Sequence, residues 1–262
     1  MLHMNLTSKS IGIVLSGGGS KGIAHAGALQ YLTEQGIEPT CIAGTSAGSI
    51  VGGLFAFGKT PKEILEFFKS IYFFHWKHFT FKKAGIVDSE SFKNYFVDVF
   101  GETTIGELKI PMYITATDLV KGELTIFNSD TKVADAILAS SSFPGVISPY
   151  EINNCLFSDG GILNHFPTDV LQGKCDFLLG VYVSPIQNIE NKDLKSIKSV
   201  TSRAFDLLSA NNSYQKFNLC DLVIEPKELA NYSTFETSKT KMDLIFKIGY
   251  HEAKKSFENL AT

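Results

Sequence analysis

The stretch 41-CIAGTSAGSI-50 places Ser46 between Gly44 and Gly48 in the pattern G-x-S-x-G. A short apolar run precedes the serine, and the charge-free run 46-SAGSIVGGLFAFG-58 follows it. Small flanking residues let a chain turn sharply from a strand into a helix, which exposes a serine hydroxyl at the turn. The helix N-terminus would favour negative charge that develops there. The pattern alone fits either a nucleophile or a Gly/Ser-rich connection packed in a core.

A second glycine motif, 17-GGGSKG-22, follows the apolar run 11-IGIVLS-16. The N–H groups of Gly17, Gly18 and Gly19 could form an oxyanion hole for an acyl-transfer intermediate. A dinucleotide site is disfavoured because 41-CIAG-44 lacks the acidic residue that such a site needs after the next strand. A Walker-type loop is disfavoured because G-K-[ST] is missing. Since neighbouring parallel strands end at one edge of a sheet, we expect Ser46 and these amides to converge on one carbonyl.

The proton acceptor for Ser46 is sought next. Asp159 stands between the expected strand 155-CLF-157 and the pair Gly160-Gly161. An aspartate can act as the base when it is partly desolvated and hydrogen-bonded directly to the serine. Its alternative role is that of a turn-forming residue before two glycines.

A Ser-His-Asp arrangement is a second possibility, and His165 and His251 stand late enough in the chain for it. Neither histidine follows a strand with turn glycines. His251 stands near Lys254 and Lys255 in an amphipathic segment, where a solvent-facing position is expected.

The rest of the chain alternates short apolar runs with helical patterns, which predicts an α/β fold with a mostly parallel sheet covered by helices on both faces. The expected strands are 11–16, 40–43, 112–119, 124–128, 155–157, 177–183 and 221–225. The expected helices are 23–36, 46–58, 61–70, 131–140, 199–217 and 241–258, with one more from Asp88 or Ser89 through Phe100. We expect residues 1–10 to be an N-terminal extension and 11–262 to be a single domain.

Composition limits the class of protein. Hydrophobic residues make up 44% and charged residues 19% of 262, and the net charge of −3 gives no basic footprint for nucleic acid. The four cysteines contain no C-x-x-C pair, so free thiols in a reducing compartment are expected instead of a zinc site. The N-terminus lacks the apolar core of a secretory signal, which predicts a cytoplasmic location; signal-independent secretion stays open. The charge-free stretch 39–58 is rich in glycine and hydroxyl residues, so it is expected in a buried core rather than across a membrane.

Taken together and in this order, G-G-G-S-K-G, G-T-S-A-G and D-G-G resemble the patatin-like phospholipase family of lipid acyl hydrolases. The stretches 139-ASSSFPGVISPY-150 and 159-DGGILNHFP-167 support the resemblance, which covers about residues 11–185. It implies a three-layer α/β sandwich, Ser46 as nucleophile, Asp159 as its partner, the Gly17–Gly19 turn as the oxyanion hole, and no metal or cofactor. The supporting motif residues are Lys21, Gly22, Gly44, Gly48, Gly160 and Gly161. Lys21 stands where the family more often has Arg, which keeps the charge and loses the planar fork.

The resemblance implies a serine lipid acyl hydrolase that cleaves fatty acyl esters of phospholipids or related lipids through an acyl-enzyme. A Ser-His-Asp esterase of small or neutral esters and a non-catalytic lipid-binding protein are the alternatives. The aromatic and basic stretch 67-FFKSIYFFHWKHFTF-81 suits either peripheral contact with a membrane or a packed helix and loop. The stripe formed by Met242, Ile245, Phe246, Gly249 and Ala253 is expected to be a core face of the last helix.

Overall fold

The computed structural model describes residues 9–71 and 85–261, in which eight strands form one sheet in the order β5-β6-β3-β2-β1-β7-β8, with β4 paired to β3. The strands are β1 Ile11–Leu15, β2 Cys41–Thr45, β3 Met112–Asp118, β4 Glu123–Ile126, β5 Tyr150–Ile152, β6 Cys155–Asp159, β7 Phe177–Val181 and β8 Leu222–Ile224. The neighbouring strands β3, β2, β1, β7 and β8 pair in parallel. Strands β4 and β6 pair antiparallel to β3, and β5 pairs antiparallel to β6. The mostly parallel sheet is therefore confirmed.

The helices of the described residues are α2 Ile23–Glu34, α3 Ala47–Phe57, α4 Pro61–Ser70, α5 Lys93–Phe100, α6 Val133–Ser140, α7 Gly161–Asn164, α8 Ile197–Tyr214 and α9 Lys239–Ala261. Short 3-10 turns are η1 Gly19–Gly22, η3 Ser89–Phe92, η4 Ile105–Glu107, η5 Thr168–Leu171, η6 Asn191–Asp193, η7 Phe217–Leu219 and η8 Lys227–Asn231. Every helix expected from the sequence within these residues is present, with ends that differ by a few residues.

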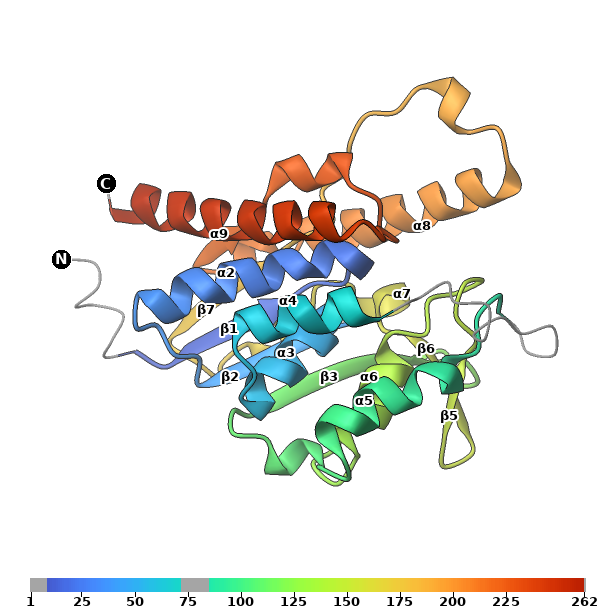
Figure 1. Ribbon diagram of the computed structural model, residues 1–262, viewed down its shortest axis with the longest axis horizontal. Helices are drawn as coiled ribbons and strands as arrows, with labels where there is room; N and C mark the ends of the chain where they lie inside the picture. The colour runs from blue at the N-terminus through green and yellow to red at the C-terminus, as the bar shows by residue number, and fades with distance from the viewer. Residues whose placement is uncertain (1–8, 72–84, 262) are drawn as a thin grey trace.

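The two faces of the sheet are covered unequally. Ile11, Ile13 and Leu15 of β1 join the larger core, to which α2, α3, α4 and α9 also contribute. Val14, on the other side of β1, joins a smaller core with Phe166, Val170, Leu171 and Tyr182. Alternate residues of a strand point to opposite faces, so one short strand supplies both layers. Figure 1 shows the long helices α2 and α9 lying side by side over the sheet.

Local sequence explains several element ends. Pro61 opens α4 as expected, and Thr60 caps it with a reciprocal bond to Glu63. The stripe of α9 is confirmed as a packing face: Met242, Ile245 and Ala253 are buried. At Gly249 an added Cβ would lie 2.0 Å from the Ala24 carbonyl oxygen, so glycine allows α9 to approach α2 closely.

One element was not expected. Residues 150-YEINNCLF-157 form a β-hairpin in which β5 pairs with β6, with Ile152 opposite Cys155. Asn153 and Asn154 occupy the two-residue loop at φ 52° and 62°. Positive φ at both loop residues is the geometry of the favoured hairpin turn, and asparagine tolerates it.

Candidate active site

Ser46 stands at a strained turn between β2 and α3, with φ 53° and ψ −123°. A positive φ at a residue with a side chain costs about 1–3 kcal/mol, and such strain clusters at functional sites. The turn is fixed on both sides: the Ser46 N–H donates to Ser140 Oγ at 2.8 Å, and the Ser46 carbonyl accepts the Ser49 and Ile50 N–H groups. At Gly48 an added Cβ would lie 2.1 Å from the Leu15 carbonyl oxygen, so α3 reaches β1 only because this residue is glycine.

The Ser46 hydroxyl meets the Asp159 carboxylate directly. Ser46 Oγ donates to Asp159 Oδ2 at 2.6 Å, and the Gly161 N–H donates to Asp159 Oδ1 at 2.7 Å. Asp159 is only 2% exposed. Burial raises the pKa of this carboxyl group to about 6, against the lowering effect of the bonds from Ser46 and Gly161. The carboxylate is therefore a stronger base than an ordinary aspartate and is already hydrogen-bonded to the hydroxyl.

Strand pairing explains how Asp159 reaches Ser46. β2 and β3 are parallel with Thr45 opposite Thr115, whereas β6 is antiparallel to β3 with Asp159 opposite Ala116. The sequence predicts that the strand ends at residue 157, which would place Asp159 after it. In the structure β6 continues to Asp159, its last residue. The register of an antiparallel strand, not a shared carboxyl edge, thus brings the carboxylate level with the serine.

The segment Ser140–Ser142 links the two side chains; from the sequence, 139–150 served only as support for the family resemblance. Besides the bond from Ser46, the Ser140 carbonyl accepts the Gly160 N–H at 3.3 Å. The Ser142 carbonyl accepts the Asp159 N–H at 3.0 Å and the Ser158 hydroxyl at 2.7 Å. The run of small hydroxyl residues in 139-ASSS-142 was the available signal, because serine can satisfy backbone groups at short range.

The glycine turn lies beside Ser46, but not all of its amides are available. The Gly17 N–H donates to the His165 carbonyl at 3.0 Å, so the expectation that this amide faces the oxyanion is wrong. The N–H groups of Gly18 and Gly19 have no acceptor within residues 9–71 and 85–261, and both residues line the pocket at Ser46. Gly19 has φ +57°, and an added Cβ would lie 2.3 Å from the Thr234 carbonyl oxygen. Gly18 and Gly19 are thus the candidate oxyanion donors.

The supporting motif residues surround this centre. Gly22 packs against Ala47, Gly44 against Gly48, and Gly160 against the Thr115 carbonyl, each too closely to admit a Cβ. Gly161 supplies the N–H donor to Asp159. Lys21 lines the pocket. Burial lowers the Lys21 pKa, and the charge of Asp206 opposes that effect.

Neither of the two histidines considered as bases lies between Ser46 and Asp159. His251 is exposed on α9. His165 lines the pocket, but 2.6 Å between Ser46 Oγ and Asp159 Oδ2 leaves no room for its ring between them. Burial, followed by the charge of Lys21, lowers the His165 pKa to about 4. Both of its ring nitrogens are buried without a hydrogen-bond partner among the described residues.

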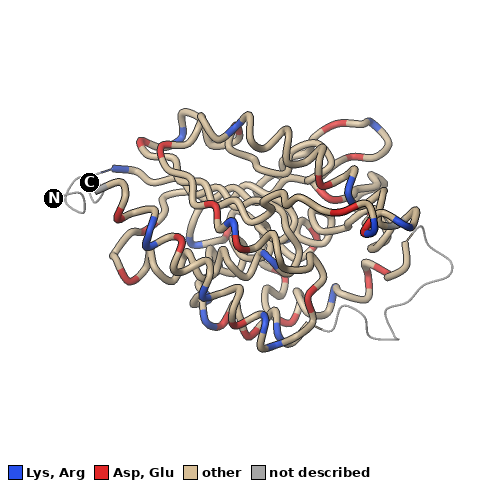
Figure 2. Tube along the Cα trace, turned by 90° about the horizontal axis from the view of Figure 1, so that it is seen from above, with Lys and Arg blue, Asp and Glu red and all other residues tan. Residues whose placement is uncertain are grey.

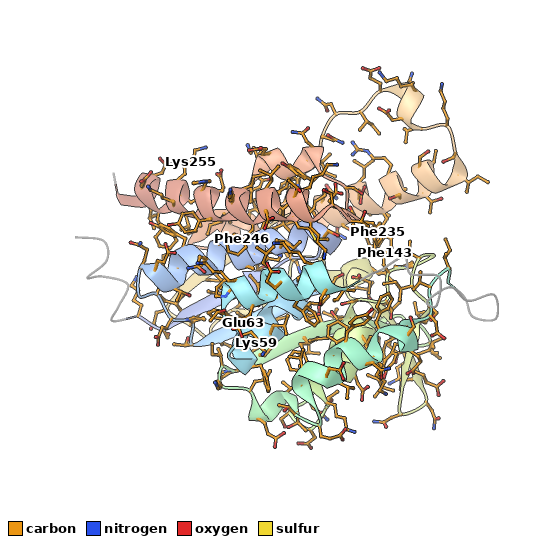
Figure 3. All side chains as sticks on the ribbon, in the orientation of Figure 1. Lys59, Glu63, Phe143, Phe235, Phe246 and Lys255 are labelled. Atoms are coloured by element: carbon orange, nitrogen blue, oxygen red, sulfur yellow. The ribbon has the colours of Figure 1, made fainter. Side chains whose placement is uncertain are left out.

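A cavity of about 260 Å³ opens at Ser46. Aromatic rings from three segments form one wall: Phe143 follows α6, Phe205 belongs to α8, and Phe235 precedes α9. The Phe143 ring lies 4.8 Å from Phe205 and 5.8 Å from Phe235, between centroids, and Figure 3 shows Phe143 and Phe235 near each other. Lys21, Arg203 and Asp206 also line the cavity. The cavity therefore combines an apolar wall with charged groups.

Other features of the surface and interior bear on partners. No group of three or more His, Cys, Asp and Glu residues in the described ranges could hold a metal ion. No helix in those ranges has the length and apolarity needed to cross a membrane. Figure 2 shows basic and acidic residues interspersed along the trace. Of the aromatic stretch 67–81, only 67–71 lies within the described residues, where Phe68 of α4 is buried and lines the cavity.

Comparison with known proteins agrees with the geometry. The family model for the patatin-like phospholipase matches residues 13–171. An uncharacterized NTE family protein of Mycobacterium bovis is 31% identical over 228 residues, covering 79% of this chain and 60% of the relative. The lysophospholipase NTE1 of Scheffersomyces stipitis is 25% identical over 257 residues, covering 92% of this chain and 16% of that protein. The chain thus spans less than two thirds of the length of either relative.

Among solved structures, VipD from Legionella pneumophila shares the fold, with a TM-score of 0.66 at 17% identity over 96% of this chain and 67% of that one. The family model covers more than half of the chain and spans all three motifs, from the strand before the glycine turn to the residues beyond Asp159. The chain therefore belongs to the patatin-like phospholipase family.

Proposed function

We propose that this protein is a serine lipid acyl hydrolase that cleaves fatty acyl esters of phospholipids or related lipids through a Ser46-Asp159 dyad. The observation that carries the proposal is the direct 2.6 Å hydrogen bond from Ser46 Oγ to a buried carboxylate. A buried aspartate with a pKa near 6 is ionised at neutral pH yet retains a raised affinity for a proton. Membership of the family supports the same chemistry.

The reaction would proceed in two acyl-transfer steps. As Asp159 Oδ2 accepts the Ser46 proton, Ser46 Oγ attacks the ester carbonyl carbon, and the Gly18 and Gly19 N–H groups stabilise the resulting oxyanion. The alcohol leaves with the proton from Asp159, and Ser46 keeps the acyl group. A water molecule then gives a proton to Asp159 and attacks the acyl-enzyme, which releases the fatty acid and restores the Ser46 hydroxyl.

Two features of the cavity support a phospholipid over a neutral ester. The wall of Phe143, Phe205 and Phe235 suits an acyl chain. Lys21 and Arg203 add positive charge that suits a lipid phosphate, and the single negative charge of Asp206 acts on both of them in the same cavity. A lysophospholipase among the relatives agrees with this substrate class.

Four free thiols fit the expected cytoplasmic location.

The test is release of fatty acid from a lysophospholipid, a diacyl phospholipid, a triacylglycerol and a short-chain p-nitrophenyl ester. Ser46→Ala and Asp159→Asn should each lower turnover of every accepted substrate by at least about a thousandfold. Asp206→Asn is the matched control, because it neutralises another carboxylate of the same cavity that does not bond Ser46. It should leave turnover of the short ester within about threefold of the parent. Full turnover in Ser46→Ala would refute the proposal.

A further inference from the structure

Helix α8 presents an apolar face to solvent. Ile197 is 89% exposed, Val200 51%, Leu207 47% and Leu208 68%. These positions, with the exposed Ala204 between them, recur at spacings of three and four residues and so lie on one side of the helix. Large exposed apolar patches on a folded protein mark interaction sites.

Helix α8 buries small and polar side chains and exposes large apolar ones, which is the reverse of an ordinary surface helix. Its buried positions are Ser209, Ala210 and Ser213, which are small or polar. Ser213 Oγ donates to the Ser209 carbonyl at 2.6 Å, which satisfies a hydroxyl that would otherwise be buried without a partner. An ordinary surface helix buries its apolar side and exposes its polar side. The large aliphatic side chains of α8 are therefore exposed instead of packed against the described residues.

The exposed face adjoins the catalytic pocket. Arg203, Phe205, Asp206 and Ser209 of α8 line the cavity that contains Ser46, so the apolar face flanks its opening. Leu163 of α7, four residues after Asp159, is 43% exposed, and α7 packs against α8. Figure 1 shows α8 and the loop before it extending from the end of the molecule where α7 and β6 lie.

The charge of this region identifies the kind of partner. Within 187–208, the segment that carries the face, the sequence has four basic residues (Lys192, Lys195, Lys198, Arg203) and three acidic residues (Glu190, Asp193, Asp206), a local charge of +1 in a chain of net charge −3, and Lys192 pairs with Glu190 at 2.8 Å. A basic segment next to exposed aliphatic side chains is the combination that binds the interface of an anionic membrane.

We propose that the apolar face of α8, formed by Ile197, Val200, Leu207 and Leu208, docks on the surface of an anionic phospholipid bilayer and holds the catalytic pocket open toward the lipid. This inference rests on the proposed function, because a lipid substrate resides in such a surface. The aliphatic side chains enter the boundary between headgroups and acyl chains, and Lys192 and Lys195 contact the anionic headgroups.

The test measures sedimentation with vesicles of equal parts phosphatidylcholine and phosphatidylglycerol, using the full chain with Ser46→Ala so that the lipid is not consumed. The double variant Ile197→Ser/Leu208→Ser should bind at least about tenfold more weakly. Leu260→Ser is the control, because Leu260 is 36% exposed near the end of α9. Figure 1 shows the C-terminal end of α9 at the opposite end of the molecule from α8. It should bind as the parent does, and vesicles of phosphatidylcholine alone should bind the parent more weakly.

Turnover of a soluble short-chain p-nitrophenyl ester separates this inference from the proposed function. With Ser46 restored, the double variant should keep this turnover while it loses hydrolysis of vesicle phospholipid. Equal vesicle binding by the double variant and the parent would overturn the inference, as would absence of vesicle binding by the parent. A dimer in light scattering that becomes a monomer in the double variant would show that a second copy covers α8 and would also overturn it. Vesicle binding through α8 without any esterase activity would contradict the proposed function alone.

Discussion

Replacing Asp159 by Asn should remove activity and stabilise the fold at neutral pH. Folding raises the Asp159 pKa from 3.8 to about 6, a shift of about two units, or roughly 3 kcal/mol. The folded protein favours the protonated form of Asp159 and disfavours the ionised form. The protonated carboxyl group therefore contributes stability that is fully present below the pKa of the unfolded chain and is lost as pH rises through about 6. Asn cannot ionise, yet it can accept the Gly161 N–H and bond Ser46 in the same geometry.

The assay is urea unfolding of the parent and Asp159→Asn between pH 4 and pH 8, followed by circular dichroism. The free energy of unfolding of the variant relative to the parent should rise by up to about 3 kcal/mol across this range. Asp169→Asn is a control of opposite sign: burial raises the Asp169 pKa, but bonds from Lys216 and Asn164 outweigh it and leave the pKa lowered. Because the folded-state pKa of Asp169 lies below 3.8, its stabilising effect is almost fully present from pH 4 upward, so that variant should be less stable than the parent by an amount that changes little between pH 4 and pH 8. A difference for Asp159→Asn that is independent of pH would refute the reasoning.

Three further predictions concern catalysis. The kcat/KM for a short-chain ester should fall about tenfold per unit as pH decreases below about 6, because protonated Asp159 cannot accept the Ser46 proton; a profile flat down to pH 4 would contradict this. His165→Gln should lower turnover by less than about tenfold, and His251→Ala should leave turnover unchanged. Loss of a general base lowers turnover by about a hundredfold or more, so a loss of that size in either variant would favour a Ser-His-Asp esterase. Gly19→Ala should lower turnover by at least about tenfold and destabilise the protein by about 1–2 kcal/mol or more, because φ is +57° and the Thr234 carbonyl oxygen occupies the Cβ position. Gly36→Ala, at φ +67° with nothing within 4 Å of its Cβ position, should destabilise and keep full turnover. Equal turnover in the two glycine variants would remove Gly19 from the proposed oxyanion hole.

Much of the fold could be predicted because its signals are local. The apolar runs before 17-GGGSKG-22 and Ser46 are buried strands of the parallel sheet, and Pro61 and Thr60 begin a helix as their residue types require. The hairpin of β5 and β6 was also within reach, since Asn153-Asn154 suits a turn with two positive φ values. It was missed because the flanking strands are short.

The parts that could not be predicted depend on contacts between distant segments. The sequence placed Asp159 near the sheet edge, but only the antiparallel pairing of β6 with β3 sets its level relative to Ser46. From the sequence, the N–H groups of Gly17, Gly18 and Gly19 are equivalent. Only the folded chain brings the His165 carbonyl to the Gly17 N–H as its acceptor. The helix expected at 199–217 gave no indication of which side would face the protein, so the exposed aliphatic face of α8 emerged only from the fold.

Reaction with a fluorophosphonate, followed by mass mapping of the modified peptide, tests the Ser46-Asp159 dyad most directly. The parent and His165→Gln should each carry a single adduct on Ser46 and form it at similar rates, while Asp159→Asn should react at least about a hundredfold more slowly. An adduct on another residue, no adduct in the parent, or a Ser46 adduct that depends on His165 and not on Asp159 would contradict the account.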